Sequence, residues 1–515
     1  MKIFKKIIAS LLTVCVIAAG VAELSINSAN AEIVSLYDWH LYMEGSNVAK
    51  MAIPKAYTVR NTIRTFESQV NAVFSTPTDM FIDDNDNIYV VDSGNARIVK
   101  MDSWGNMIYE VSAIECRHGE DEECDHVNSS SVLSKPNGIF VNSDSIYIAD
   151  TGNRRVVQLD LDGYFVREYT KPNDPALTDY PFDVTKVAVS NRGIIYLLLE
   201  TDFQGFIMLN DAGEYMGNTG MTRTTTNFVE YLWSKLSTGN SLLQRTSYTA
   251  PPYSNFMIDG EGWIYATVET VETNQITKLN SVGTNVFGNG ESVQYGRNFY
   301  EITDELTYES AHYVSNFVDL TVDPDGIVYA LDDTLGNIFL YDQESNNLAY
   351  FGELGTNRGK FRKPVAIDIM SDGTLAVLDA GTGYITIFES TQFCDLMKKG
   401  TTLYRNAQYN EARDVWTQLL QLDANYIYAH KAIGRAYYKE ENYQEAMAEY
   451  KLAKDKEGYS LAFEANKSVL TKKYFFVLVL IIALLIVGFV IGYRKLKKYV
   501  DKLHVKVTTW GGDDE

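Results

Sequence analysis

Apolar and polar residues alternate over short stretches that are separated by turn-forming residues, and one such stretch stands out. The apolar run Ile88–Val91 follows an Asp-rich turn, and a Ser-Gly-Asn turn at 93–95 leads to a second run, Arg97–Met101. Alternation with a period of two is typical of strands with one buried face, and Gly and Asn tolerate the positive φ of tight turns. A strand that begins with proline precedes this hairpin, so the pattern predicts a unit of about four short antiparallel strands.

This unit occurs six times along the chain. The second copy, Ile146–Gly163, aligns residue by residue with the first, and fainter copies begin at Gly193, Gly262, Gly326 and Gly373. No single copy can bury its apolar face, so the repetition predicts neighbouring units that cover one another. The predicted fold is all-β, a six-bladed propeller over residues 32–390.

The repeated string Pro-x-Gly, followed by Ile-Tyr-Val-Ala-Asp-Thr-Gly-Asn-x-Arg-Val, resembles the NHL repeat. The resemblance covers about residues 74–390 and is close in the copies at 74–111 and 133–170. In that family the repeated Asp, Asn and Arg side chains brace neighbouring strands. The resemblance therefore implies a structural role for Asp92, Asn95, Arg97, Asp150, Asn153 and Arg155.

The last copy, Gly373–Ser390, supplies only three strands. A β-prone run at 56–65, close to the N-terminus, is the predicted fourth strand, so that the two ends of the propeller sequence close the ring. Closure removes the free sheet edges that favour aggregation.

Two segments interrupt the propeller rhythm and are the predicted binding loops, because loops on a rigid scaffold commonly carry binding surfaces. Residues 216–252 contain a helical pattern, for which a helix that only covers the propeller face is the alternative. Residues 288–315 are rich in tyrosine, which suits stacking on sugar rings or contact with an aromatic or peptide ligand. The predicted ligand contacts are Trp233, Arg245, Tyr295, Tyr300, His312 and Tyr313.

An acidic loop between the first two copies carries Cys116, His118, Cys124 and His126. In an oxidising compartment a Cys116–Cys124 disulfide is favoured, and closing this loop would contribute roughly 2–3 kcal/mol. The same four side chains are also of the type that binds zinc, although the spacing within each Cys-x-His pair is tight for one ion. A loop with neither feature is the third alternative.

Beyond Ser390 the sequence period changes to 34 residues. This spacing resembles the tetratricopeptide repeat, a helix–turn–helix unit with small residues where helices cross and aromatic residues between them. The resemblance covers about residues 394–456 within a helical region at 391–472, and implies a face that grips a protein partner. The matched pairs are Gly400 with Gly434, Tyr404 with Tyr438, Tyr409 with Tyr443, Ala412 with Ala446, and Trp416 with Tyr450.

Two apolar segments predict export and membrane anchoring. Residues 1–31 have a basic start, an apolar run and a small-x-small site, typical of a cleaved signal peptide, with an uncleaved anchor as the alternative. Residues 475–493 carry no charge and as a helix span about 28 Å, one bilayer core. Lys and Arg are concentrated in the tail at 494–515, so the positive-inside rule predicts a cytoplasmic tail and an external N-terminal region. A capping helix is expected separately at 459–470.

Charge and motif content narrow the function. The net charge of −22 argues against a nucleic-acid partner. The chain lacks a Walker loop, HExxH, GxSxG and a dinucleotide fingerprint, and of its histidines only His40 and His312 are expected near the propeller channel. Asp-rich turns at 83–86 and 323–325 suit calcium, but such turns more often lack a metal. We therefore predict no catalytic residue and no cofactor.

Two functional hypotheses follow. The first is a single-span surface protein that captures glycans or docks a partner protein at an uptake or envelope complex. The second is a membrane-tethered enzyme, similar to propeller lactonases or lyases, that uses a metal in the channel. Inward-pointing Asp, Glu, Asn or His side chains at the propeller axis would favour the enzyme, and an apolar or Tyr-lined axis would favour binding.

Overall fold

A computed structural model describes residues 37–44, 47–64, 73–116, 131–200, 205–220, 252–268, 272–290, 293–304 and 309–508. The chain divides into two compact units, one that holds the sheets and ends at Cys394, and one that begins at Asp395 and holds most of the helices. The expected signal peptide at 1–31 and most of the insertion at 216–252 lie outside the described residues.

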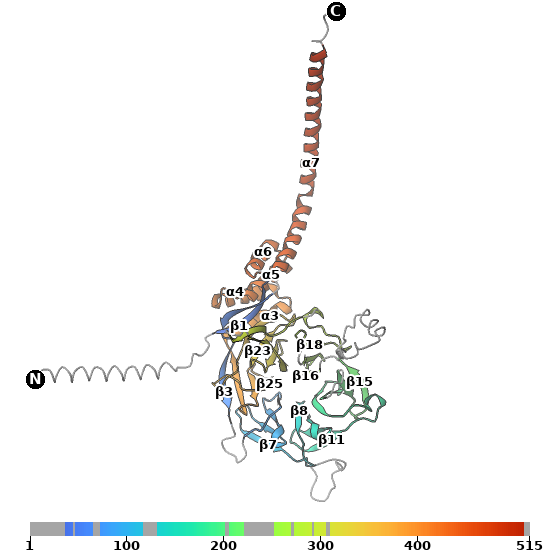
Figure 1. Ribbon diagram of the computed structural model, residues 1–515, viewed down its shortest axis with the longest axis vertical. Coiled ribbons are helices and arrows are strands. Elements are labelled where there is room, and N and C mark those ends of the chain that lie inside the picture. The colour runs from blue at the N-terminus through green and yellow to red at the C-terminus, as the bar shows by residue number, and fades with distance from the viewer. Residues whose placement is uncertain are drawn as a thin grey trace, which may run out of the picture. The chain divides into compact units, whose positions relative to one another are not determined.

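The first unit contains six blades in its described part (Figure 1). Blades 1 to 3 have four strands each. Blade 1 consists of β4 (Asp79–Ile82), β5 (Ile88–Asp92), β6 (Arg97–Met101) and β7 (Met107–Val111), and blade 2 of β8 (Pro136–Val141), β9 (Ser145–Asp150), β10 (Arg155–Asp160) and β11 (Phe165–Tyr169). Blade 3 consists of β12 (Val184–Val189), β13 (Ile195–Leu199), β14 (Phe206–Leu209) and β15 (Tyr215–Thr219). Blade 4 has three described strands: β16 (Tyr253–Ile258), β17 (Ile264–Val268) and β18 (Ile276–Leu279).

Blades 5 and 6 both recruit strands from the N-terminal part of the chain. Blade 5 consists of β21 (Phe317–Val322), β22 (Val328–Asp332), β23 (Asn337–Tyr341) and β24 (Asn347–Phe351), extended at its outer edge by β1 (Tyr37–Glu44) and β2 (Asn47–Pro54). Blade 6 consists of β25 (Pro364–Ile369), β26 (Leu375–Asp379), β27 (Tyr384–Ser390) and β3 (Tyr57–Ile63). The run expected to close the ring thus corresponds to β3, which pairs antiparallel with β27. The added β1–β2 hairpin on blade 5 has no counterpart among the sequence-based expectations.

The first strands of the six blades lie side by side in the order β4, β8, β12, β16, β21 and β25, and β25 contacts β4 again. The ring is therefore closed, and the six-bladed propeller predicted from the repeats is confirmed. Apolar side chains from neighbouring blades share clusters, so that Ile63 and Phe74 pack with residues of blades 1 and 6. No blade buries its faces alone, which is why a repeat of this kind requires the closed ring.

The repeated Asp, Asn and Arg form one hydrogen-bonded corner in blade 2. Asp150 Oδ2 accepts from Asn153 Nδ2 at 2.8 Å and from Arg155 Nε at 2.8 Å, and Asp150 Oδ1 accepts from the backbone N–H of Ser134 at 2.7 Å. Arg155 also donates to Glu168 at 2.9 Å. Asp92, Asn95 and Arg97 repeat these bonds in blade 1. Each corner joins the start of a blade to its second and third strands.

The turn between the second and third strands differs from the expectation in one respect. Positive φ occurs at Ala96 (51°) and Arg154 (56°), immediately after the Ser/Thr-Gly-Asn residues, and not at the glycine. The glycine is required for space, because a Cβ on Gly94 would lie 2.5 Å from the Ser75 carbonyl oxygen. That carbonyl accepts the Gly94 N–H at 2.8 Å.

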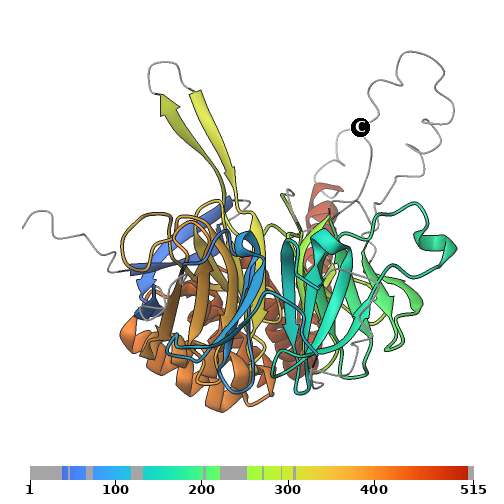
Figure 2. The same cartoon turned by 90° about the horizontal axis from the view of Figure 1, so that it is seen from below.

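A two-stranded sheet lies between blades 4 and 5 in the sequence and does not join the ring. Its strands β19 (Asn298–Asp304) and β20 (Glu309–Val314) pair antiparallel, with Phe299 opposite Tyr313. Figure 2 shows this hairpin standing out from the propeller. The tyrosine-rich insertion at 288–315 therefore contains a projecting hairpin.

The second unit consists of helix pairs. The helices are α3 (Gln392–Arg405), α4 (Tyr409–Leu422), α5 (Ile427–Lys439), α6 (Tyr443–Leu452) and α7 (Lys456–Thr508). Two sets of contacts repeat between the pairs: Tyr404 with Tyr409 (ring centroids 5.4 Å apart) and Tyr438 with Tyr443 (5.5 Å), and Gly400 against Trp416 and Gly434 against Tyr450. Ala412 and Ala446 are fully buried.

Helix α7 corrects the expected division of the C-terminal region. A capping helix and a membrane segment were expected as separate elements, but both belong to one helix of 53 residues. Its first turns pack against α6 and α5. The part from Lys456 to Lys502 is long and apolar enough to cross a membrane, and none of its most apolar stretch is buried in the protein.

We expect the corner carboxylate of blade 2 to be essential for stability. In Asp150→Ala the buried Arg155 guanidinium loses a carboxylate partner, and the Ser134 and Asn153 donors lose their acceptor, so the free energy of unfolding should fall by about 3–5 kcal/mol. Chemical denaturation of the full chain measures this loss. Asp144→Ala, which removes an exposed carboxylate from the turn of the same blade, is the control and should change stability by less than about 0.5 kcal/mol. Equal stability of the two variants would contradict a bracing role.

Candidate functional site

Polar side chains meet at the propeller axis because the first strands place one residue of each blade at an equivalent position. This position is defined by the pairing of the first strand with the second strand of the same blade. In every blade the residue lies opposite the last but one residue of the second strand. The six residues at the position are Asp79, Gly138, Lys186, Asn255, Asp319 and Ala366. We call the four polar ones, Asp79, Lys186, Asn255 and Asp319, the axial cluster.

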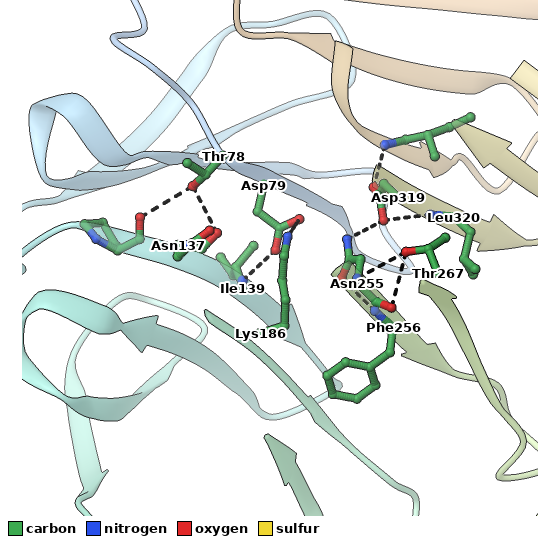
Figure 3. Close-up of polar contacts among 12 residues, drawn as sticks. Thr78, Asp79, Asn137, Ile139, Lys186, Asn255, Phe256, Thr267, Asp319 and Leu320 are labelled. Carbon is green, nitrogen blue, oxygen red and sulfur yellow. Dashed lines mark hydrogen bonds and ion pairs between the residues drawn. The ribbon is translucent and has the colours of Figure 1, made fainter. Parts of the chain in front are cut away.

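The members of the axial cluster bind one another across the ring (Figure 3). Lys186 Nζ lies 2.9 Å from Asp79 Oδ1, which joins blades 3 and 1. Asn255 Nδ2 donates to Asp319 Oδ1 at 2.5 Å, which joins blades 4 and 5. All four side chains are buried, with residue exposures between 5% and 8%. Because these polar groups are buried, each of them needs a hydrogen-bonding or charged partner.

Backbone N–H groups complete the coordination of the axial carboxylates. Three aspartates each accept an N–H from the next blade: Asp79 from Ile139 at 3.0 Å, Asp319 from Ile367 at 2.7 Å, and Asp368 from Ile82 at 2.7 Å. The three donating strands, β8, β25 and β4, each lie at the edge of their blade. The N–H groups on the free side of an edge strand have no partner in the sheet ladder, and the neighbouring carboxylates satisfy them here.

Two carboxylates near the axis, Asp319 and Asp368, hold their protons more tightly than ordinary aspartates. Burial raises the pKa of Asp319 well above its usual range; Lys186 opposes this effect and Asp79 adds to it. Burial, together with the nearby Asp79, raises the pKa of Asp368 to about 6. Thr321 Oγ1 donates to Asp368 Oδ1 at 3.1 Å.

The axis is therefore polar, which is the feature that favoured the enzyme hypothesis, but its groups are occupied by one another. The oxygens of Asp79 and Asp319 accept from Lys186, Asn255 or backbone N–H groups. Within the described part of the chain, no group of three or more His, Cys, Asp or Glu side chains is arranged to hold a metal ion. The geometry fits cross-blade bracing more directly than chemistry on a substrate.

Neither histidine expected near the channel joins the axial cluster. His40 is buried in β1 at the outer edge of blade 5 and stacks with Tyr42, with ring centroids 6.3 Å apart. His312 is exposed on β20, and its Nε2 lies 2.5 Å from Asn298 Oδ1.

The residues predicted to contact a ligand do not form one site among the described residues. Tyr295 is 1% exposed and stacks on Phe287, so its predicted ligand contact is corrected to a core position. The segment before β19 folds back along blade 4, where Gln275 Oε1 accepts the Tyr295 N–H at 3.1 Å, and this directs the ring inward. Tyr313 lies on the projecting hairpin and stacks on Phe299, with centroids 5.3 Å apart.

The other predicted positions are only partly described. Trp233 and Arg245 lie outside the described residues. Tyr300 belongs to β19, and of this residue only the backbone is described. Cys116 is disulfide-bonded, while Cys124, its expected partner, lies outside the described residues. Cys394 is a buried free thiol.

The Asp-rich turns suggested for calcium use their carboxylates to hold the turn. Asp83 Oδ1 accepts the N–H groups of Asn85 and Asn87, both at 2.9 Å, and Asp83 Oδ2 accepts from Tyr89 Oη at 3.1 Å. Asp323 repeats this arrangement in blade 5, where Tyr329 Oη donates to it at 3.1 Å. Asp83 and Asp323 thus hold the turns that precede Ile88-Tyr89 and Val328-Tyr329.

The axial cluster was not recognised from the sequence, although a signal for it exists. Pro136 and Pro364 begin the first strands of blades 2 and 6, and Pro77 lies just before that of blade 1. The axial residue follows each proline by two positions, at Asp79, Gly138 and Ala366. Extending the alignment to Lys186, Asn255 and Asp319 would have placed charged and small residues on one ring.

Comparisons with known proteins identify no family for this chain. No family model and no curated protein matches the chain. Among solved structures, virginiamycin B lyase from Staphylococcus aureus is similar at 11% identity over 65% of this chain and 89% of its own, with a TM-score of 0.35. A protein of unknown function from Bacteroides thetaiotaomicron is similar at 12% identity over 67% of this chain and 80% of its own, with a TM-score of 0.41. The WD40 propeller domain of Doa1 is similar at 8% identity over 69% of this chain and 97% of its own, with a TM-score of 0.37. These likenesses concern the fold alone, and no function is transferred from them.

The raised pKa of Asp368 predicts a specific pH dependence of stability. Because its pKa is about 6 in the folded protein and 3.8 ordinarily, the folded state binds more protons between these values, and stability falls as pH rises through this window. Asp368→Asn keeps an acceptor for the Ile82 N–H but cannot ionise. Urea denaturation of the full chain between pH 4.5 and 7.5 should show about 1–3 kcal/mol less pH dependence in this variant.

The matched control is Asp372→Asn in the same blade. Burial alone would raise the pKa of Asp372, but its hydrogen bonds with Thr374 and Arg60 together outweigh burial and lower the pKa. The wild-type carboxylate therefore loses its stabilising effect as pH falls, which is the opposite sign. Burial also raises the pKa values of Asp38 and Asp332 to about 6. These two residues therefore contribute part of the pH dependence of stability in every variant. An unchanged slope in Asp368→Asn would contradict the assignment.

Proposed function

We propose that this protein is a membrane-anchored, extracytoplasmic binding and scaffold protein. The propeller is its rigid platform, and the helical unit, as tetratricopeptide-type repeats, docks a protein partner. The single observation that carries this proposal is helix α7, which joins a packed helical unit to an apolar segment that the protein itself does not cover.

The exposure of α7 supports a membrane environment. A core helix of a soluble protein is mostly buried, and a signal sequence lies near the N-terminus, whereas the apolar stretch of α7 is unburied and lies near the C-terminus. Its side chains are large and exposed, for example Phe476 at 82% and Phe489 at 76%. Leaving such a surface in water costs roughly 25 cal/mol for each Å². Insertion in a bilayer removes this cost, with the basic tail on the cytoplasmic side.

Repeated contacts in the helical unit support the tetratricopeptide assignment. The small residues Gly400 and Gly434 lie against the aromatic residues Trp416 and Tyr450, which are the pairs matched at 34-residue spacing. A third helix, the start of α7, covers the second pair, so the repeats have a cap. The arrangement supports a docking role of the kind that the sequence resemblance implies.

The occupied axis supports binding over catalysis. Its carboxylates, ammonium and amide are engaged in joining blades, and this leaves the projecting hairpin and the turns as the accessible surfaces. We propose that the propeller captures a glycan or docks a partner protein at a surface uptake or envelope complex. The hairpin's stacked Phe299 and Tyr313, next to Arg297 whose guanidinium lies 4.4 Å from the Phe299 ring, are the described aromatic groups that suit this role.

We expect α7 to hold the full chain in the membrane. Membranes from expressing cells, washed at alkaline pH, should retain the wild-type protein, and Ile481→Arg with Leu485→Arg should move it to the supernatant, since each Arg costs about 2.5–3.5 kcal/mol at the centre of a span. The control is Leu452→Arg, which adds the same charge at an exposed site on α6 and should stay in the membrane fraction. Release of the wild-type protein by the wash would contradict membrane anchoring.

The polar axis favours a second candidate function, that of a lactonase- or lyase-like enzyme. Substitution of Lys186 distinguishes this function from the proposed binding function. If Lys186 only braces blades, Lys186→Met leaves Asp79 buried without its cation and lowers stability by about 3–5 kcal/mol, and adding Asp79→Asn restores much of this loss. Thermal unfolding of the two variants measures the effect. An activity on lactone substrates that disappears in both variants, while the double variant regains stability, would instead support the enzyme.

A further inference from the structure

His430 lies where three parts of the helical unit meet. It belongs to α5, its Nδ1 lies 2.7 Å from Glu449 Oε2 on α6, and its Nε2 lies 3.1 Å from the carbonyl oxygen of Ala424 in the turn between α4 and α5. The His430 side chain is 13% exposed and that of Glu449 is 24% exposed. Limited access to water makes the direct partners of the ring important.

Both partners of the ring are acceptors, and this restricts its protonation state. A carboxylate and a carbonyl oxygen cannot donate a hydrogen bond, so both interactions form only when both ring nitrogens carry a proton. Neutral histidine has one protonated nitrogen and would turn a lone pair toward either Glu449 or Ala424. The geometry therefore selects the imidazolium ion.

We propose that His430 is a proton-operated clamp, whose imidazolium ring ties α5 to α6 and to the α4–α5 turn, and whose deprotonation loosens the helical unit. The charged surroundings agree with this proposal. The hydrogen bond that His430 donates to Glu449 is the main cause that raises the pKa of His430, with Asp423 directly after α4 adding to it, while partial burial opposes it. Of the elements packed against α5, α7 contributes no group among these causes.

The sign of the pH effect follows from the direction of the shift. Because the folded state holds the proton more tightly than the unfolded state, the clamp stabilises the helical unit fully below the ordinary histidine pKa of 6.5 and loses its effect as pH rises through the raised value. Mildly acidic surroundings should therefore tighten the unit, and alkaline surroundings should loosen it.

The clamp also bears on α7. Tyr450 follows Glu449 on α6 and packs against Gly458 at the start of α7, where an added Cβ would lie 2.5 Å from the Tyr450 ring. Ala462, one turn further along α7, is fully buried in the same cluster as Tyr450. Loosening of α6 would thus reach the first turns of the long helix. This inference does not depend on the proposed binding function or on a membrane.

Hydrogen exchange of the full-length protein, followed by mass spectrometry between pH 5.5 and 8.5 and corrected for the intrinsic effect of pH, tests the clamp. We expect peptides from α5 and α6 in the wild type to lose protection several-fold as pH rises. His430→Gln cannot titrate and should show corrected protection that is independent of pH. Glu449→Gln removes the main cause of the raised pKa, so its loss of protection should occur at lower pH than in the wild type.

His312→Gln is the matched control, since it removes the exposed histidine of the propeller hairpin and should leave the α5 and α6 profile unchanged. A wild-type profile without a pH-dependent loss would overturn the proposal. So would a loss that persists in His430→Gln, or one that does not move in Glu449→Gln. If His430→Gln proves too unstable to measure, the direction of the Glu449→Gln shift decides alone.

Discussion

Acceptance of backbone N–H groups by carboxylates of the preceding blade is the interaction on which the closed ring depends. Blades contact one another mainly through apolar side chains, which do not fix how one first strand slides along the next. The bonds from Ile139 to Asp79, Ile367 to Asp319 and Ile82 to Asp368 do fix it, because a slip would leave a buried carboxylate and a buried N–H without partners. The last of these bonds joins blade 6 to blade 1 at the β25 edge of blade 6, and the N-terminal strand β3 completes the opposite edge of that blade.

Burying charges at the axis costs desolvation free energy, and this cost bears on which residues occupy the equivalent positions of the other blades. Lys186 is the ammonium that pairs with Asp79 there, and the equivalent positions in blades 2 and 6 are Gly138 and Ala366. A side chain on Gly138 would meet the Thr185 carbonyl oxygen at 2.4 Å, so the strand that carries Lys186 approaches only because blade 2 has no Cβ there. Size and charge at these positions are thus coupled: Gly138 makes room for the strand of Lys186, and the attraction between Lys186 and Asp79 offsets the desolvation of the two charges.

The repeats could be predicted from the sequence because their signals are local. A corner such as Asp150, Asn153 and Arg155 lies within six residues, and its hydrogen bonds form inside one blade. The axial cluster depends on contacts over long separations, 286 residues for Ile82 and Asp368, and on bulges that shift the register. Tyrosine content led to a wrong prediction at Tyr295 for a related reason, since composition does not show whether a ring faces the core or solvent. The hydrogen bond from the Tyr295 N–H to Gln275, immediately before β18, fixes the ring in the core.

Helix α7 places the helical unit and the apolar segment in one continuous element, with consequences for both. An α-helix fixes about 100° of rotation and 1.5 Å of rise for each residue, so packing of Gly458 and Ala462 against α6 sets the orientation of every later turn. A flexible linker would have isolated the two parts from each other. Because the helix is continuous, a change in how α5 and α6 pack alters the surface against which the first turns of α7 lie, and α7 also carries the apolar segment. The polar contacts of His430 therefore lie where a small change in the packing of the helical unit alters the orientation of the whole of α7.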